Sequence, residues 1–372
     1  MAPAPSVALD ATPLLGQRSG VGNYVRGLVD GLAALDDGPD VLLTLFSIRG
    51  TVPGPLPART RPAPRRAPAR LLRRTWSRWS WPPAELLTGR VAAFHGTNFV
   101  LPPLARAGGL VTVHDLAYLR YAETVTGDAA AYAQLVPAAL ARGAHVLAVS
   151  TAMAEEIAAE YGLPADRLTV AHHGIDPAWS RAVPLAAPEL ARLGLPDRYV
   201  LFAGNLEPRK NLGLLLRAHR AARRADPSVP RLVLAGPAGW GDRWQGSPPD
   251  PADVVVAGYL ADDDLRGVVA GAAAVCMPSH YEGFGLPVVE ALAAGRPVLA
   301  SDIPAHREVA RGHAVLLPPD DADAWAAALS RTTELDGAPE RAARRAHAGS
   351  FTWADSARAH LAAYARAAAD RS

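Results

Sequence analysis

Lysine is almost absent from this chain. Lys210 is the only one, so 37 of the 38 basic residues are arginine. Together with the many alanines and prolines, this bias is typical of a genome with GC-rich codons, in which arginine replaces lysine wherever it serves as well. Lys210 stands directly after Arg209 in the stretch AGNLEPRKNL (203–212). Because an ammonium group and a guanidinium group bind anions differently, the surviving lysine indicates a position with a specific task.

The sequence contains one cysteine, and it shows neither a signal-peptide pattern nor a long apolar run. The single cysteine, Cys276, excludes an internal disulfide and favours a reducing, cytoplasmic location. The N-terminal MAPAPSVALDATPLL has no basic region followed by a long apolar run, so we expect no signal peptide. No run of 18 apolar residues occurs, so we expect no membrane-spanning helix and only peripheral contact with a membrane, on its inner face.

Acidic residues are absent between Asp40 and Glu85, where arginine is concentrated. The first half of segment 57–83 is too rich in proline for a helix, but a short helix over 69–81 would place Leu72, Trp76 and Trp79 on one side. Three interpretations stay open: contact with an anionic membrane, a loop that faces the acceptor, or a solvated loop whose tryptophans pack on the first domain. A net charge of only +2 and the lack of a recognised binding fold argue against nucleic acid. The arginines concerned are Arg49, Arg59, Arg61, Arg65, Arg66, Arg70, Arg73, Arg74 and Arg78.

The 372 residues, of which 49% are hydrophobic, suffice for two domains. Short, nearly continuous apolar runs alternate with longer helical patterns, as is typical of parallel strands that helices bury on both faces. We therefore predict the α/β class, with two Rossmann-like, doubly wound domains that face each other across a cleft. The expected strands are 6–11, 41–46, 92–97, 110–115, 145–150 and 168–173 in the first half, and 199–204, 231–236, 253–258, 273–278, 297–302 and 314–319 in the second.

The same pattern gives the domain boundaries. Residues 1–176 form the first domain, which the C-terminal helix 352–372 joins; 177–190 is a proline-rich linker, and 191–351 is the second domain. Ligands of such sheets bind at the carboxyl ends of the strands.

Arg209 and Lys210 follow the strand 199–204 by a short loop, and a helix begins after them with Asn211 as a possible N-cap. Two cations beside a helix N-terminus form an anion site, because the helix dipole and the backbone N–H groups act in the same direction. A pyrophosphate has two phosphate groups in different orientations, so one can bind the planar guanidinium of Arg209 and the other the compact ammonium of Lys210.

The stretch PSHYEGFGLPVVEALAAGRPVLAS (278–301) predicts a loop with two glycines and then a helix, which Pro287 begins and Gly295 ends. Glu282 lies in the loop and Glu290 about one turn past the proline. A carboxylate on the helix can accept hydrogen bonds from the two hydroxyls of a ribose.

These motifs resemble the retaining glycosyltransferases of family 4, which have the GT-B fold. GNLEPRKN, followed by SHYEGFGLPVVEALAAGRPVLASDIPAHREV, carries the most specific likeness. DATPLLGQRSGVGNYVRGL, VHDLAYL and HHGID extend it over nearly the whole chain.

The resemblance implies a role for each matching residue. Arg209 and Lys210 match the pair that binds the diphosphate of the donor, Glu290 matches the carboxylate on the ribose, and Glu282 matches the acid near the donor sugar. His114 matches a histidine near the anomeric carbon, although a histidine at a strand end is often structural. The remaining donor-binding candidates are Gly20, Gly22, Gly204, Gly258, Tyr259, Leu260, Gly283, Phe284, Gly285 and Leu286. We interpret His172 and His173 as structural or as lying beside the hinge.

The implied reaction moves a sugar from a nucleotide-sugar, with GDP-mannose as the favoured donor, to an acceptor hydroxyl of a glycan, a lipid-linked sugar or a small molecule, with retention of configuration. No Asp-x-Asp motif stands at a strand end, and Asp262, Asp263 and Asp264 open a helix instead, so we expect no metal ion and no cofactor. Two alternatives remain. One is a sugar-nucleotide-binding or scaffolding protein without activity. The other is a phosphorylase-like enzyme in which Lys210 carries pyridoxal phosphate.

Overall fold

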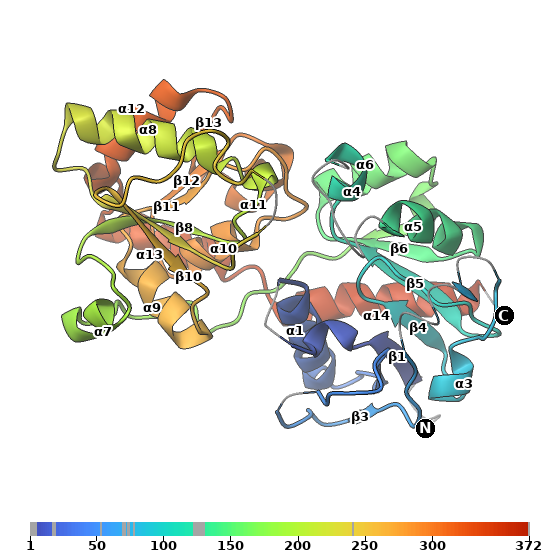
Figure 1. Ribbon diagram of the computed structural model, residues 1–372. Coiled ribbons are helices and arrows are strands. Elements are labelled where there is room, and N and C mark those ends of the chain that lie inside the picture. The colour runs from blue at the N-terminus through green and yellow to red at the C-terminus, as the bar shows by residue number, and fades with distance from the viewer. Residues whose placement is uncertain are drawn as a thin grey trace. The chain divides into compact units, whose positions relative to one another are not determined.

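The computed structural model describes residues 6–16, 20–52, 54–68, 72, 75–76, 79–121, 131–239 and 242–370. The chain divides into two compact units (Figure 1). The first contains Met1–Gly174 and Phe351–Ser372, and the second contains Ile175–Ser350. The segment 177–190, which we expected to be a linker, belongs to the second unit, where Leu185 lies against Gly267.

The first unit is built on a parallel sheet with the strand order β3-β2-β1-β4-β5-β6-β7. The order reverses between β1 and β4, as in a doubly wound fold. Helices α1 and α14 pack together on one face of this sheet, and α5 and α6 lie on the other (Figure 1). The strands are β1 (Ser6–Asp10), β2 (Asp40–Thr44), β3 (Thr60–Pro62), β4 (Ala93–Gly96), β5 (Gly108–Val113), β6 (His145–Ala148) and β7 (Leu168–Val170). The helices are α1 (Gly20–Ala34), α3 (Glu85–Thr88), α4 (Ala117–Arg120), α5 (Tyr132–Ala141), α6 (Thr151–Tyr161) and α14 (Trp353–Ala369).

The second unit has a parallel sheet of order β10-β9-β8-β11-β12-β13, with the same reversal between β8 and β11. Helices α8 and α12 pack on one face, and α10 and α13 on the other. The strands are β8 (Tyr199–Ala203), β9 (Arg231–Ala235), β10 (Val254–Gly258), β11 (Val275–Met277), β12 (Val298–Ser301) and β13 (Val315–Leu317). The helices are α7 (Ala187–Arg192), α8 (Leu212–Ala225), α9 (Asp262–Gly271), α10 (Leu286–Ala293), α11 (Pro304–Ala310), α12 (Ala322–Ser330) and α13 (Ala338–Ala348).

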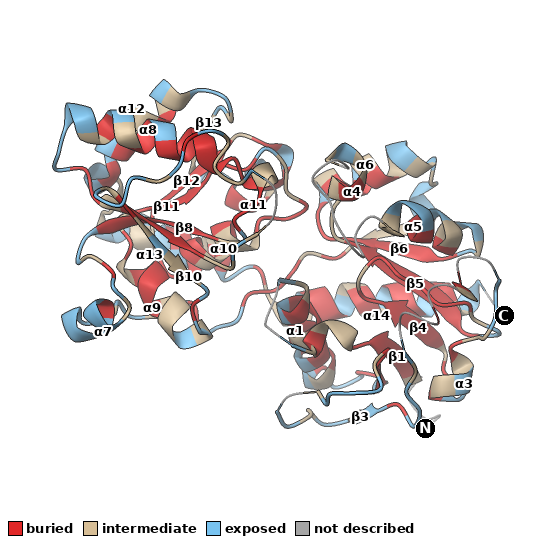
Figure 2. Cartoon of the chain, viewed as in Figure 1, coloured by how far each residue is buried: buried red, intermediate tan, exposed pale blue. Residues whose placement is uncertain are grey.

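The predicted fold class is confirmed, and each of the twelve predicted strands is present within one to three residues of its expected bounds. Most strands are buried along their length, which explains their continuous apolar sequences (Figure 2). No sequence pattern predicted β3. It is three residues long, exposed and ends in proline, which fits an edge strand that no apolar run announces.

Trp353 packs α14 against α1, and it fits there because α1 has glycine at the two positions that face it. A Cβ atom on Gly27 would lie 2.0 Å from the indole of Trp353, and one on Gly31 would lie 2.5 Å from its carbonyl oxygen. Both glycines are therefore required by close approach of the two helices. This contact attaches the end of the chain to the first unit.

A buried polar network also joins α14 to the first sheet. The Tyr24 hydroxyl lies 2.9 Å from Thr112 Oγ1 and 2.8 Å from His360 Nε2. His95 lies 2.7 Å from the same threonine oxygen and 2.9 Å from the Tyr364 hydroxyl. Burial lowers the pKa of His360 to about 4, against a weaker opposing effect from its bond to the Ser356 carbonyl. The imidazole rings are therefore neutral at pH 7.

The arginine-rich segment is partly structural. Arg59 donates to the carbonyl groups of Ala33, Leu35, Asp36 and Gly38, which lie at or just beyond the end of α1. This guanidinium satisfies acceptors that the helix end leaves open. Arg70, Arg73, Arg74 and Arg78 lie outside the described residues.

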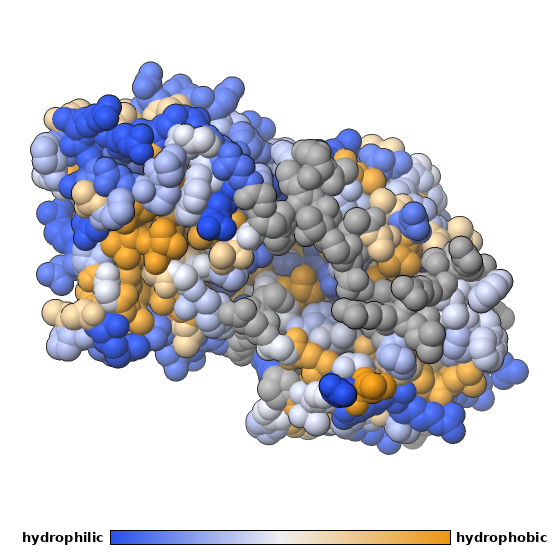
Figure 3. Space-filling model, viewed as in Figure 1, coloured by the Kyte–Doolittle hydropathy of each residue, from blue (hydrophilic) through white to orange (hydrophobic). Residues whose placement is uncertain are grey.

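The tryptophans of this segment do not share one face. Trp76 is buried and donates to the Pro82 carbonyl oxygen at 3.0 Å, whereas Trp79 and Trp81 are about two-thirds exposed, at 65% and 67%. Figure 3 shows that apolar side chains reach the surface of both units in separate patches. None of the helices in the described ranges is long and apolar enough to cross a membrane.

Candidate active site

The loop after β8 brings the predicted cation pair to the carboxyl edge of the second sheet. Gly204, directly after the strand, has a φ of 149°, and the turn of 3-10 helix Pro208–Lys210 then carries both cations. Asn211 follows with a φ of 55° and does not cap α8 through its side chain, contrary to our expectation. Its amide donates instead to the carbonyl groups of Pro278 at 3.1 Å and Pro319 at 2.7 Å. These bonds tie the loop to the ends of two other strands.

Both cations are ion-paired to Glu282. Lys210 Nζ lies 2.6 Å from Glu282 Oε1, and Arg209 Nη1 lies 3.0 Å from Glu282 Oε2. Arg209 also pairs with Glu207 at 2.6 Å, and Ser279 Oγ donates to Glu282 Oε1 at 2.6 Å. The structure thus brings three predicted site residues together and adds Glu207, which the sequence analysis missed.

The charges within this cluster balance. Glu207 and Glu282 contribute two negative charges, and Arg209 and Lys210 contribute two positive ones. Burial alone would raise the pKa of Glu282, but Lys210 and Arg209 outweigh it and hold this pKa far below its ordinary value. The carboxylate therefore stays ionised, and the two cations are preorganised at the ends of the strands.

His306 of α11 is a second residue that the sequence analysis did not single out. It is fully buried, and its Nδ1 donates to the Ser301 carbonyl oxygen at 2.9 Å. Its Nε2 has no hydrogen-bond partner within the part of the chain that the structure describes. A Cβ on Gly285 would lie 3.1 Å from the His306 ring, so glycine at this loop position makes room for the imidazole. In the sequence, only its position in PAHREV, at the end of the family-like stretch given above, points to His306.

The glycine-rich loop leads directly into α10. Gly283, Phe284 and Gly285 are buried, and Gly285 adopts a φ of 100°. Helix α10 begins at Leu286 with Pro287 in its first turn, as predicted. The loop backbone therefore lies against the ionic cluster, since Glu282 is its first residue.

Glu290 of α10 is half-buried and makes no side-chain hydrogen bond to any residue in the described ranges. Burial raises its pKa to about 7, with Arg266 opposing and Asp176 reinforcing this shift. A carboxyl group with this pKa is divided between its neutral and ionised forms near pH 7. It is therefore an acceptor whose charge a ligand can change.

The predicted nucleobase segment follows β10. Gly258 has a φ of 69° next to a register shift in the β10–β9 pairing, and its carbonyl oxygen accepts from the Gly236 N–H at 2.7 Å. Tyr259 is 43% exposed, whereas Leu260 is buried. An exposed aromatic ring beside a buried leucine suits a planar ligand.

The other predicted residues belong to the first unit. Gly20 begins α1 and is exposed, and Gly22 is buried in the same helix; residues 17–19 of this turn lie outside the described ranges. His114 follows β5, with its Nε2 2.8 Å from the Thr97 carbonyl oxygen. Burial lowers its pKa, against a weaker opposing effect of that carbonyl. His114 is therefore a neutral hydrogen-bonding group.

His172 and His173, which we interpreted as structural, pack on aromatic rings of the first unit. His172 lies 6.1 Å from the ring of Phe351, and His173 lies 4.9 Å from Tyr24. No cluster of three or more metal-binding side chains occurs among the residues that the structure describes.

Two Rossmann-like units in one chain are the architecture of GT-B glycosyltransferases. Sucrose-phosphate synthase from Thermosynechococcus elongatus has the same fold, with a TM-score of 0.66 over 97% of this chain and 98% of that one, at 21% identity. Residues 18–179 match the family described as "Glycosyltransferase Family 4", and residues 197–334 match "Glycosyl transferases group 1".

Curated relatives give the family. The O-antigen chain mannosyltransferase B of Escherichia coli is 32% identical over 270 residues, which are 70% of each chain. A D-inositol 3-phosphate glycosyltransferase of Kineococcus radiotolerans is also 32% identical, over 70% of this chain and 66% of that relative, just under two thirds of its length. The chain belongs to glycosyltransferase family 4.

Proposed function

We propose that this glycosyltransferase moves a sugar from a nucleotide-sugar to an acceptor hydroxyl with retention of configuration, and that Arg209 and Lys210 bind the diphosphate of the donor. The observation that carries the proposal is the buried, charge-balanced cluster of these cations with Glu207 and Glu282. A buried ionic cluster that contains a carboxyl group with a strongly lowered pKa is a common feature of ligand-binding sites. Family membership and the position at the strand ends indicate which ligand this is.

In the proposed reaction the acceptor oxygen forms a bond to the anomeric carbon on the face from which the diphosphate leaves. The bond between the anomeric carbon and the phosphate oxygen breaks, and the departing phosphate takes the acceptor proton. Arg209 and Lys210 stabilise the negative charge that grows on the leaving oxygen. Glu282 holds both cations in position before the donor arrives, so little reorganisation is needed during the reaction.

The rest of the donor has complementary neighbours. Glu290 accepts hydrogen bonds from the ribose hydroxyls, and Tyr259 with Leu260 lines the nucleobase. Backbone N–H groups of residues 283–286 contact the sugar and the phosphate. In the first unit, His114, Gly20 and Gly22 complete the set, with His114 as a neutral partner for the donor sugar.

Lys210 provides the first test. Lys210→Ala should lower kcat/KM at least 100-fold, because removing one preorganised donor from a developing oxyanion costs about 2.7–4 kcal/mol. Lys210→Arg should also lose most activity, since a guanidinium has to displace groups around a nearly buried ammonium. The matched control is Arg217→Ala, which removes an exposed cation from the neighbouring helix α8. Wild-type turnover by both Lys210 variants, measured by nucleotide release, would refute the proposed role.

The donor that we propose is GDP-mannose, because a named relative is a mannosyltransferase. Incubation with GDP-, UDP- and TDP-sugars, followed by mass spectrometry of the products, identifies the donor. Anomeric coupling constants of the product decide between retention and inversion. Binding of a nucleotide without any turnover would favour the alternative of a binding protein.

We also propose that the reaction needs neither a divalent metal ion nor a cofactor. Full activity in excess EDTA is the expected result, whereas loss of activity and rescue by magnesium would refute it. Pyridoxal phosphate is disfavoured because the Lys210 ammonium is in an ion pair with Glu282. An absorbance band near 410 nm in the purified protein would reverse that conclusion.

We retain peripheral contact with an anionic membrane on its cytoplasmic face as a proposal. The exposed Trp79 and Trp81 support it, because tryptophan favours the membrane interface. The triple variant Arg70→Ala, Arg73→Ala and Arg74→Ala should float less with anionic liposomes than the wild type. Equal flotation of the two proteins would remove this proposal.

A further inference from the structure

The loop that follows β9 lies against the loop that follows β8. Leu206 and Ala238 pair as an isolated parallel bridge, and the Leu206 N–H donates to the Pro237 carbonyl oxygen at 3.2 Å. A Cβ on Gly239 would lie 2.2 Å from the Leu206 carbonyl oxygen, so the two backbones are in direct contact. Residues of the loop after β9 can therefore reach the turn Pro208–Lys210, which carries both cations.

Gln245 reaches this turn with both polar atoms of its side-chain amide. Its Nε2 donates to the Pro208 carbonyl oxygen at 3.2 Å, and its Oε1 accepts from the Gly213 N–H at 3.2 Å. A carbonyl group can only accept and an N–H group can only donate, so these two partners fix the orientation of the amide. Pro208 begins the turn, and Gly213 is the second residue of α8. The amide therefore bridges the two ends of the segment that contains Lys210.

The bond to Gly213 supplies a cap that α8 otherwise lacks. A residue at the N-cap position normally accepts from the N–H of the second or third helical residue. Asn211 stands at that position, but its side-chain amide donates to the carbonyl groups of Pro278 and Pro319 instead. Gln245 accepts from the second helical residue in its place. The first turn of α8 is therefore fixed from the loop after β9.

The fit between Gln245 and Gly213 is tight. A Cβ on Gly213 would lie 2.7 Å from the Gln245 Cβ and 2.9 Å from the Trp244 carbonyl oxygen, so this helical position requires glycine. Gln245 has a φ of 49°, a left-handed conformation that is unfavourable for a residue with a Cβ, and its N–H donates to the Asp242 carboxylate at 2.9 Å. Backbone strain of this kind is concentrated at functional sites.

These contacts affect Lys210 more than Arg209. Arg209 has anchors of its own, since its guanidinium donates to a backbone carbonyl group and pairs with two carboxylates. The position of the Lys210 ammonium depends on the backbone of the turn, which the Pro208 carbonyl oxygen closes by accepting from the Asn211 N–H at 3.0 Å. Gln245 donates to the same carbonyl oxygen and so holds the closed turn in place.

We propose that Gln245 is a positioning residue for the donor diphosphate and that it acts through Lys210. A neutral amide can fix this turn without disturbing the balance of two cations and two carboxylates in the ionic cluster. The Gly213 N–H, which a helix N-terminus would otherwise offer to an anion, is used for this support. The inference rests on the proposed binding of the diphosphate by Lys210.

Nucleotide affinity tests the proposal without any turnover. The probe is the nucleotide, among GDP, UDP, TDP and ADP, that binds the full chain most tightly in excess EDTA, measured by isothermal titration. Gln245→Met keeps the length of the side chain but removes both hydrogen bonds, and it should weaken binding at least tenfold. In the Lys210→Ala background the same change should weaken binding threefold at most, because the group that Gln245 positions is gone. The matched control Gln134→Met, at an exposed position of α5, should have no effect.

Gly213→Ala disrupts the same contact from the side of the helix. Its methyl group would displace Gln245, although alanine is the better residue for the interior of a helix. The variant should therefore weaken nucleotide binding as Gln245→Met does, and it keeps the test decisive if Gln245→Met fails to fold.

Three results would overturn the inference. The first is unchanged affinity in both Gln245→Met and Gly213→Ala. The second is tighter binding by Gln245→Met, which would mean that the amide keeps an anion away from the Gly213 N–H. The third is an equal loss of affinity from Gln245→Met in the wild-type and Lys210→Ala backgrounds.

Failure of the donor proposal is read separately, from Lys210→Ala alone. If Lys210→Ala loses affinity and Gln245→Met does not, the role of Gln245 is wrong and that of Lys210 stands. If none of the four nucleotides binds the wild type, both proposals are wrong.

Discussion

Acidification tests the buried histidine network of the first unit most sharply. His360 has a pKa of about 4 in the folded protein because it is buried, whereas an unfolded histidine has a pKa of about 6.5. Since the unfolded chain binds the proton more readily, the stabilising contribution is complete above pH 6.5 and is lost as the pH falls toward 4. Between pH 7.5 and pH 5 this residue alone should cost about 2 kcal/mol of unfolding free energy.

Two other groups have to be separated from this effect. The stabilisation that comes with the low pKa of Glu282 is complete above its unfolded value and is lost only at lower pH, so Glu282 adds little pH dependence above pH 5. The raised pKa of Glu290 acts in the opposite direction, because its penalty is relieved as the pH falls below about 7. A comparison of the wild type with His360→Gln cancels both contributions, since neither residue belongs to the network.

The assay is urea unfolding at pH 7.5, 6.5, 5.5 and 5, and hydrogen exchange of peptides from α14 monitors the unfolding of this helix. The stability difference between wild type and His360→Gln should shrink by about 2 kcal/mol over this range. Thr333→Ala, at an exposed position of the second unit that carries no ionisable group, is the control and should keep the pH dependence of the wild type. A difference that does not change with pH would refute the burial of a neutral imidazole.

Three further results are expected. Gly27→Ala should destabilise the protein by about 1–3 kcal/mol, because the added methyl group would overlap the indole of Trp353 in α14. Gly20→Ala has open space around it and should change stability by no more than about 0.5 kcal/mol. Equal thermal denaturation of the two variants would contradict this packing. The affinity for a nucleoside diphosphate should rise about tenfold from pH 6 to pH 8, because ribose binding favours the ionised form of Glu290. Calorimetry should find no such pH dependence in Glu290→Gln. Arg59→Ala should cost about 1–3 kcal/mol through the carbonyl groups it leaves open, whereas the exposed Arg61→Ala should change urea stability by no more than about 0.5 kcal/mol.

The fold was predictable from sequence because buried parallel strands produce continuous apolar runs, and these runs fix both the fold class and the strand positions. Beta-strand β3 escaped this reasoning because it is short, exposed and proline-terminated. Asn211 stands at the N-cap position of α8, as expected, but its side chain bonds elsewhere for a reason that the sequence does not show. Its partners, Pro278 and Pro319, lie 67 and 108 residues further along the chain, and local propensity carries no information about them.

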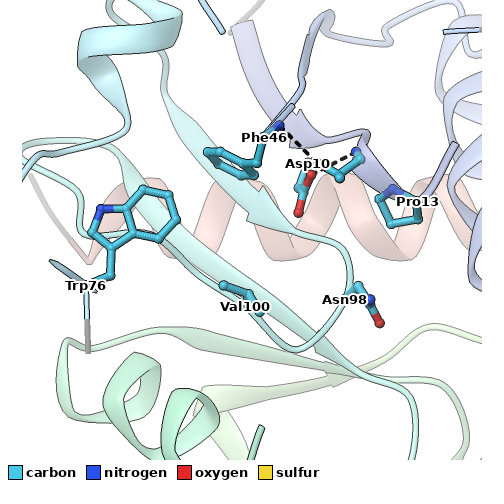
Figure 4. A pocket seen from close by; sticks show the side chains of 7 residues that line it. Asp10, Pro13, Phe46, Trp76, Asn98 and Val100 are labelled. Carbon is cyan, nitrogen blue, oxygen red and sulfur yellow. Dashed lines mark hydrogen bonds between the residues drawn. The ribbon is translucent and has the colours of Figure 1, made fainter. Parts of the chain in front are cut away.

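The candidate site was predictable only in part. Glycine-rich loops at strand ends indicated where Arg209, Lys210 and Glu282 would lie, but their mutual ion pairing depends on distances that spacing does not give. The network around His360 was beyond sequence reasoning because Tyr24, its partner, is 336 residues away. The pocket lined by Asp10, Phe46, Asn98 and Trp76 likewise combines residues from three strand ends with a segment that has no regular periodicity (Figure 4).

The central claim is that Lys210 and Arg209 hold a nucleoside diphosphate. Isothermal titration of the wild type with GDP, UDP, TDP and ADP in excess EDTA tests it directly, with Lys210→Ala and Arg217→Ala as the paired variants. One nucleotide should bind the wild type and Arg217→Ala with equal affinity and Lys210→Ala at least 100-fold more weakly. Equal affinity for Lys210→Ala, or no binding of any of the four nucleotides to the wild type, would contradict the claim.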